Sequence, residues 1–576
     1  MSASPIVGID LGTTYSLVAV LQNGAPAVIP NALGELLTPS AVSLATDGLV
    51  LVGAPARARA TTHPARTALA FKRDMGTDRK YTLGDRTFTP PELSALVLSS
   101  LKKDAEAALG MPIEEAVITV PAYFGDLQRQ ATRAAGAIAG LKVERIINEP
   151  TAAALAYGLH ERKRELRAIV LDLGGGTFDV TVLQIMEGVI EIQASAGDAR
   201  LGGEDFDTAL AQQVAARINK AHGVEIQHMP LAWARLRGAA ELAKHRLTDA
   251  ERTRIVLPDL DAGGRTIQVD EPIDRAEAEE VWADLLERIR APTVRALRDA
   301  GLAVRDVDEV LLVGGSTRMP CVSHLAAQLF GRLPLRKLPP DEAVAQGAAV
   351  QAALKEGRAE VEDMVVTDVA PFSMGVEMAN RFGERVVGDL FAPILERGTI
   401  IPASRERVFS TMADNQPAID IHVYQGEHSQ CSKNQKLATY RLGSLPPMPA
   451  GRIAIAVRFT YDQNGILEID LNMDQLKRKE SFVVLQRPGV LSEAEVSAAR
   501  EAMAKLKLHP RDALPNATLL ARGDALFVEL TGAAREQLGH ALAKFRAALD
   551  QQQTELIEEV RTLLTAIIAM HRSSQQ

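Results

Sequence analysis

The sequence predicts a multidomain chain: an α/β part built from two similar halves comes first, followed by an all-β part and a helical end. A motif of strand, glycine turn and strand occurs twice in the first third of the chain. Strands alternate with helical patterns as far as about residue 357, which is typical of layered α/β folds. Beyond it, apolar residues alternate at period two before helical spacing returns. At 576 residues the chain is too long for one core, so about three or four compact units are expected.

The duplicated motif is the strongest functional signal. Residues 6–14 align without a gap with residues 168–176, so that Asp10 matches Asp172 and Gly12 matches Gly174. Turns without side chains let backbone N–H groups approach a phosphate, and a carboxylate at a strand end can hold a water-clad Mg²⁺. Both copies continue as strand, which excludes the Walker loop and the dinucleotide fingerprint. One such turn alone could be an ordinary hairpin, but the duplication favours two half-domains that bind one nucleotide between them.

The region between the two copies begins with a basic, polar stretch that contains Lys72. Composition alone predicts that Lys72 is a surface charge. Helical spacing then predicts a helix over 92–109 and another over 126–140, with short buried strands at 116–120 and 143–147. The second strand runs into Glu149, which precedes Pro150 at a helix start. A carboxylate at this junction suits either catalysis or N-terminal capping of the helix, and both interpretations are open.

After the second copy the chain adds two further polar regions. Residues 197–207 form a glycine-bearing loop that opens a helix, and a helix over 233–247 carries Glu241 and Lys244, by default solvent-facing charges. A strand at 309–313 delivers a third loop of small residues, Gly314 to Arg318, whose shape suits close approach of a ring or a phosphate.

The last third of the chain begins with a polar connector, after which helical periodicity disappears. An apolar island at 364–368 inside this connector resembles a linker that docks as a strand. Period-two alternation predicts strands at 419–424 and 453–459, with a hairpin turn at 462–465. Helices follow from Ser492, where Ser492 and Glu495 form a capping box, to about residue 571.

Composition restricts the partners and the compartment. The net charge of -9, from 73 acidic and 64 basic residues, argues against nucleic-acid binding. Cys321 and Cys431 have no ligand-spaced neighbours, which indicates reduced thiols. Neither a signal peptide nor a membrane-length apolar run is recognised, so we expect a cytoplasmic protein that does not insert into membranes.

Taken together, these motifs resemble the seventy-kilodalton heat-shock chaperones of the DnaK type. The resemblance runs in order from the first motif past the linker to about residue 475. It rests on residues 10–14, 120–124, 146–154, 172–179, 201–207, 314–320, 340–345, 409–411, 414–416 and 423–427.

The resemblance implies a domain order and an activity. The order is an actin-like (duplicated ribonuclease-H-like) ATPase domain over 1–357, a linker over 358–369, a β-sandwich that binds extended apolar peptide over 370–490, and a short helical lid over 491–576. ATP hydrolysis would be coupled to peptide affinity. ATP and Mg²⁺ are the implied cofactors, with K⁺ as a further candidate.

The resemblance also assigns site residues. The catalytic set is Lys72, Glu149, Thr13, Asp10 and Asp172, and the two aspartates also hold Mg²⁺, mostly through water. The nucleotide-binding set adds Gly12, Thr14, Gly174, Gly175, Gly176, Thr177, Gly203, Glu241, Lys244, Gly314, Gly315, Ser316 and Arg318. Pro121, Arg129 and Asp368 would relay the nucleotide state. Val376, Met378, Met412, Ile419 and Ile421 would surround the peptide.

Several departures from the family pattern point to its specialised HscC branch. The chain is shorter between Lys72 and Pro90, the linker has Thr367 within an island that is leucine-rich in the family, and the hairpin between Met378 and Thr399 is long. Expected partners are unfolded clients, a J-domain co-chaperone and, as a further candidate, a nucleotide-exchange factor; we expect a monomer. The alternatives are an actin-fold metabolite kinase and an actin-like filament protein, both of which leave the β module unexplained.

Overall fold

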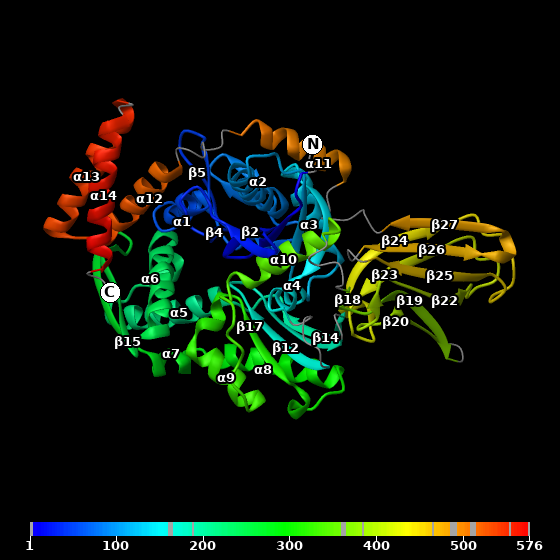
Figure 1. The fold of residues 1–576 in the computed structure, drawn as a ribbon. Helices are drawn as coiled ribbons and strands as arrows, with labels where there is room; N and C mark the ends of the chain where they lie inside the picture. Colours follow the sequence, from blue (N-terminus) through cyan, green and yellow to red (C-terminus); the bar gives the residue numbers. More distant parts are fainter. Residues whose placement is uncertain are drawn as a thin grey trace.

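The computed structural model describes residues 4–158, 165–186, 189–358, 365–382, 385–462, 466–483, 492–506, 514–551 and 554–573. An α/β part occupies the middle of the molecule, a β-sandwich projects from one end, and a group of C-terminal helices lies at the other (Figure 1). No described helix has the length and apolar character needed to span a membrane.

The α/β part contains two sheets of the same design. In each, a hairpin of antiparallel strands carries the duplicated motif, and its first strand also pairs in parallel with a later strand, β10 or β17. The first sheet contains β1 (Val7–Leu11), β2 (Tyr15–Gln22), β3 (Ala25–Ile29), β4 (Thr38–Pro39), β10 (Glu115–Val120) and β11 (Lys142–Asn148). The second contains β12 (Leu166–Leu173), β13 (Phe178–Met186), β14 (Val189–Asp198), β17 (Glu309–Val313), β18 (Val365–Val369) and β21 (Ile400–Ile401). The internal repeat is therefore an architectural duplication.

Two helices, α4 (Glu149–Ala156) and α10 (Ala343–Lys355), lie between the sheets (Figure 1). A Cβ added at Gly347 of α10 would overlap the backbone of Ala152 in α4, and one added at Gly8 of β1 would overlap the backbone of α10. These glycines let helix, helix and strand approach at backbone distance. The packing joins the two sheets into one core layer.

Other helices cover the outer faces of the sheets and define two lobes. The first lobe, built on the first sheet, includes α1 (Ala54–Arg59), α2 (Pro90–Leu109) and α3 (Asp126–Ile138), with short strands β5 (Val42–Leu44), β6 (Val50–Val52), β7 (Thr67–Ala68), β8 (Tyr81–Leu83) and β9 (Arg86–Phe88). The second lobe includes α5 (Gly203–His222), α6 (Pro230–Asp249), α7 (Arg275–Val281), α8 (Ala283–Asp299), α9 (Pro320–Phe330) and the hairpin of β15 (Arg252–Asp261) and β16 (Thr266–Asp274).

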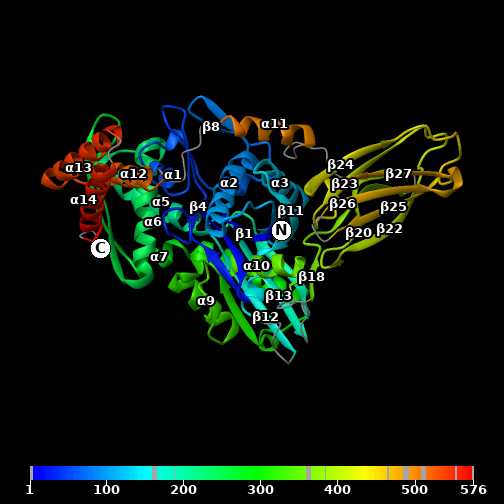
Figure 2. The ribbon, with the colours of Figure 1, turned by 45° about the horizontal axis from the view of Figure 1, so that its top comes forward.

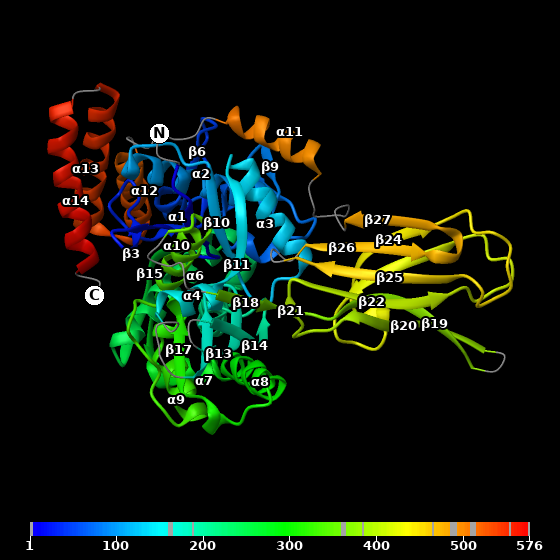
Figure 3. The same ribbon diagram turned by 45° about the vertical axis from the view of Figure 1, so that its right-hand side comes forward.

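The connector after the second lobe docks as a strand, as its apolar island predicts. β18 pairs in parallel with β14, with Thr367 opposite Glu191, and in antiparallel fashion with β21. The β-sandwich then extends away from the lobes (Figure 3). One of its sheets contains β19 (Met374–Phe382), β20 (Arg385–Leu395), β23 (Ile419–Gln425) and β24 (Gln435–Leu442), and the other contains β22 (Ala403–Ser410), β25 (Ala454–Tyr461), β26 (Leu467–Met473) and β27 (Arg478–Val483).

The C-terminal helices lie on the α/β part in this structure. Helix α11 (Glu493–Ala504), which begins with the predicted capping box, packs through Val496, Ala499 and Met503 on the core beneath α2 and α3 (Figure 2). Helices α12 (Leu514–Glu529), α13 (Gly532–Gln551) and α14 (Thr554–Ser573) form a bundle with its own apolar core. The bundle lies at the opposite end of the molecule from the β-sandwich (Figures 1 and 3).

Most predicted elements appear within a few residues of their predicted bounds. The strand at 309–313 is β17, and the helix predicted over 233–247 extends as α6 over Pro230–Asp249. Of the predicted turn at 462–465, residues 463–465 lie outside the described part of the chain, as do residues 359–364 of the linker. Both cysteines are buried and free, as their spacing indicates.

Candidate functional site

A cavity of about 910 Å³ lies between the two lobes. It is lined by all the predicted catalytic and nucleotide-binding residues except Gly176: Asp10, Gly12, Thr13, Thr14, Lys72, Glu149, Asp172, Gly174, Gly175, Thr177, Gly203, Glu241, Lys244, Gly314, Gly315, Ser316 and Arg318. Residues that are far apart in the sequence therefore meet in one space. Their chemical roles stay predictions.

The two glycine hairpins face each other across this cavity. A Cβ added to Gly175 would overlap the Thr14 hydroxyl, and one added to Gly176 would crowd the Thr13 side chain. The Gly176 carbonyl accepts a hydrogen bond from Arg73 Nε of the first lobe at 2.9 Å. The first hairpin thus contributes side chains, and the second contributes bare backbone, where the two meet at the cavity.

The second hairpin is held by two other loops. The Gly174 carbonyl accepts hydrogen bonds from Gly203 N at 3.0 Å and Ser316 Oγ at 2.9 Å. Gly314, at φ 81°, has no room for a Cβ because the Leu173 carbonyl lies there. The three small-residue loops of the sequence are therefore parts of one wall.

Lys72 and Glu149 form a buried ion pair inside the cavity. Lys72 Nζ lies 2.7 Å from Glu149 Oε1, and the two residues are 3% and 7% exposed. The interpretation of Lys72 as a surface charge is therefore wrong. Glu149 is the first residue of α4, and the N-cap residue Asn148 makes no capping hydrogen bond with its side chain, so catalysis and capping both stay predictions for Glu149. A buried pair is costly to desolvate, which makes such positions functional candidates.

Three carboxylates that line the cavity, Asp10, Glu149 and Asp172, lie close to a fourth, the buried Asp179. Burial, and then the neighbouring Glu149, raise the pKa of Asp10 to about 7 and that of Asp179 to about 7. The same two causes raise the pKa of Asp172, whose Oδ2 atom is buried and accepts no hydrogen bond from the described residues. An unpartnered oxygen beside like charges fits a divalent cation, because hard cations prefer carboxylate and water oxygens.

The cavity is also lined by charged residues of α6 and the third loop. Lys244 Nζ lies 2.8 Å from Asp207 Oδ1 and donates to the Gly203 carbonyl at 3.0 Å. Glu241 pairs with Arg57 of the first lobe. Burial alone would raise the pKa of Glu241, but Arg57 and Lys244 together lower it. The Glu241 carboxylate is therefore ionised, and its ion pair with Arg57 joins the two lobes.

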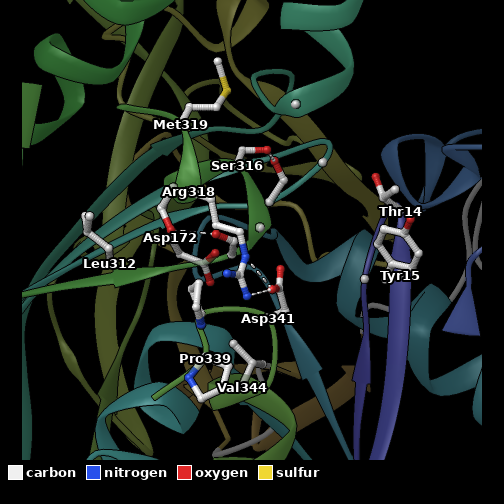
Figure 4. Close-up of a pocket in the computed structure, with 18 of the residues that line it drawn as sticks. Thr14, Tyr15, Asp172, Leu312, Ser316, Arg318, Met319, Pro339, Asp341 and Val344 are labelled. Atoms are coloured by element: carbon white, nitrogen blue, oxygen red, sulfur yellow. Dashed lines mark hydrogen bonds and ion pairs between the residues drawn. The ribbon is translucent and has the colours of Figure 1, made fainter. Parts of the chain in front are cut away.

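Apolar residues, here called the apolar wall, also line the cavity and were not predicted from the sequence. They are Leu312, Met319, Leu335, Pro339 and Val344, all of which except Leu335 are labelled in Figure 4. Asp341, which pairs with Arg318 (Nε to Oδ2, 2.9 Å), and Tyr15 also line the cavity and were not predicted. The match at residues 340–345 could have indicated Asp341 and Val344, and the match at 314–320 could have indicated Met319, whereas Leu312, Leu335 and Pro339 lie outside the matched motifs. An apolar surface bounded by charges suits a purine ring and its ribose.

The residues predicted to relay the nucleotide state lie in buried or paired positions, and their relay role stays a prediction. Arg129 is buried and donates to Asn148 Oδ1 at 2.6 Å, next to Glu149, and to the Phe124 carbonyl at 3.1 Å. Pro121 begins the same segment, in which Tyr123 contacts Phe372 at the start of the sandwich with 4.4 Å between ring centroids. The backbone of Asp368 pairs with Ile401 in the ladder of β18 and β21.

The predicted peptide-binding residues lie in the β-sandwich, mostly on two neighbouring strands. Val376 and Met378 are on β19, and Ile419 and Ile421 are on β23. Val376 and Ile421 are buried in the sandwich core, whereas Met412 is 36% exposed. Peptide binding by this set stays a prediction.

A comparison with protein families fits an ATPase part followed by β and helical parts. The family model described as Hsp70 protein matches residues 6–83 and 78–573, which is nearly the whole chain. The chain therefore belongs to the Hsp70 family, whose members are chaperones and ATPases that bind ATP with Mg²⁺.

Proposed function

We propose that the cavity binds ATP between the two glycine hairpins and hydrolyses its terminal phosphate. The observation that carries this proposal is the meeting of Thr13 and Thr14 with the bare backbone at Gly175 and Gly176. Asp10 and Asp172 would hold Mg²⁺ through water, and that ion would neutralise phosphate charge. K⁺ is a further candidate ion.

The chain's own groups then do little beyond positioning and charge neutralisation, which is what phosphoryl transfer requires. Lys72 donates to the terminal phosphate from a desolvated position, where its charge acts strongly. Glu149, or a water held by Thr13, orients the attacking water. The apolar wall, Glu241 and Arg318 hold the adenosine end.

We further propose that ATP hydrolysis is coupled to the binding of extended apolar peptide by the β-sandwich. Three contacts support a mechanical connection between the parts: the ladder of β18 with β14, the Tyr123–Phe372 ring pair, and the ion pair of Arg397 with Asp299 at 3.1 Å. Coupling between two sites is reciprocal, so peptide must affect hydrolysis if hydrolysis affects peptide affinity.

The experiment that tests this function measures steady-state ATP turnover with and without an unfolded apolar peptide. Faster turnover with the peptide supports the chaperone function. Acceleration by a sugar, or assembly into filaments without any response to peptide, would instead support the kinase or filament alternatives, which the family match does not favour.

We also propose a family branch, protein partners and a compartment for this protein. The long hairpin of β19 and β20 and Thr367 within the docked β18 support the HscC branch and a narrow client range. A J-domain co-chaperone and a nucleotide-exchange factor would be the protein partners of a monomer. The free, buried Cys321 and Cys431 support a reducing compartment such as the cytoplasm.

A further inference from the structure

The C-terminal bundle, residues 514–551 and 554–573, contacts both lobes of the α/β part. Its first helix, α12, lies against α1 of the first lobe and β15 of the second. Figure 2 shows α12 next to α1, with α13 and α14 outside it. The described parts of the bundle belong to a segment far from both lobes in sequence, so this contact is a tertiary one.

The contact with the first lobe has an apolar seat and an ion pair. Ala517 of α12 packs against the small cluster of Ala41, Leu51 and Ala56. Arg522 Nη2 lies 2.7 Å from Glu35 Oε1. The small residues on both sides let the helices approach closely.

The contact with the second lobe depends on one buried arginine. Arg235 of α6 is 7% exposed and donates to the Val528 carbonyl of α12 at 3.0 Å and to the Pro258 carbonyl of β15 at 3.0 Å. Arg535 of α13 adds an ion pair with Asp259 at 3.4 Å. The end of α12 is therefore held by a guanidinium that also organises the bulge of β15.

The elements that the bundle joins are those that must separate for the cavity to open at this end. α1 carries Arg57 and α6 carries Glu241, whose ion pair crosses from lobe to lobe at the cavity. If α6 moves away from α1, α12 must lose either its seat on the first lobe or its bonds to Arg235. Separation of the lobes therefore costs the free energy of the bundle's contacts in addition to that of the contacts between the lobes.

We propose that the C-terminal bundle is a bridge across the two lobes that slows nucleotide release, so that undocking of the bundle accelerates it. This rests on the proposed ATP site, because the bridge acts by keeping that cavity closed. A helical segment at the end of the chain would in this way set how long the nucleotide stays bound.

The test measures the release of a fluorescent ADP analogue from the full-length protein by rapid mixing with excess ATP. Ala517→Arg, which places a long charged side chain in the apolar seat, is expected to speed release about 5-fold or more. Arg522→Glu is expected to speed it about 2- to 5-fold, and the charge-swapped Arg522→Glu/Glu35→Arg to return it toward the wild-type rate. Lys544→Glu, on the exposed face of α13, is the matched control and leaves the rate unchanged.

Wild-type release rates in both Ala517→Arg and Arg522→Glu would overturn the bridge. If Ala517→Arg fails to fold, the charge-swap cycle decides by itself, and release that stays fast in the double swap contradicts the proposal. Failure of the proposed function looks different: the wild-type protein would then not bind the ADP analogue at all.

Discussion

The two glycine hairpins share a sequence motif and a strand pairing, but their surroundings divide the work between them. In the first, Asp10 Oδ1 accepts a hydrogen bond from Thr119 at 3.1 Å, and Thr13 and Thr14 project toward the other hairpin. In the second, the turn has no side chain to offer, Asp172 keeps an unpartnered oxygen, and two remote loops fix the Gly174 carbonyl. One copy supplies hydroxyl groups and the other supplies a rigid backbone surface.

This difference has a direct consequence for substitution. The first hairpin should tolerate the loss of a side chain, whereas the second should not tolerate the gain of one. Removal of Lys72, which lies where the two hairpins converge, should lower ATP turnover more than a change in either hairpin.

The largest expected effect comes from Lys72, which belongs to neither hairpin and lies where both converge. Lys72→Ala leaves Glu149 buried without its partner, which costs about 3–5 kcal/mol of stability, and should lower ATP turnover about 10³-fold or more. Single-turnover hydrolysis and thermal unfolding measure the two losses. Lys103→Ala, at an exposed lysine of α2, is the control, and full ATPase activity of Lys72→Ala would remove the catalytic assignment.

The next largest effect should follow from filling the second hairpin. Gly175→Ala puts a methyl group where the Thr14 hydroxyl lies, so the hairpins must move apart, and we expect turnover to fall about 10²- to 10³-fold. Gly443→Ala in the β-sandwich, where a new Cβ meets nothing within 4 Å, is the matched control. Equal turnover in the two variants would show that the hairpins do not meet as described.

A smaller effect is expected from emptying the first hairpin. Thr14→Ala removes one hydroxyl but leaves the backbone of both turns in place, so turnover should fall no more than about 10-fold. Steady-state kinetics with varied ATP measure it. A loss as large as that of Gly175→Ala would contradict the proposed division of work.

How far the sequence predicts this site depends on the kind of signal. Asp10, Asp172 and the glycines are predictable because a turn that binds phosphate restricts residue type at each position. Lys72 looks like a surface charge by composition, and only the family resemblance identifies it. The apolar wall at Leu312 and Pro339 was missed because apolar residues are common, and only the fold brings them together.

The fold, too, is predictable only in the parts that leave a pattern in the sequence. Apolar runs predict the two hairpins, β10, β11, β17 and the docking strand β18, because burial on a pleated sheet requires alternation or a continuous apolar run. They did not indicate β3, β4, β14 or β21. Such runs also do not predict where the C-terminal bundle docks. That contact uses Ala517 against Ala41 and Ala56, and small residues carry no periodic signal that distinguishes a tertiary contact from a helix interior.

A double-mutant cycle of Asp10→Asn and Asp172→Asn, measured by single-turnover ATP hydrolysis, tests the central claim that both hairpins act on one ATP. Each single variant should slow hydrolysis, and the double variant should be little slower than the worse single one, with a coupling energy of about 1 kcal/mol or more. Strictly multiplicative losses, or full activity in either single variant, would contradict the account.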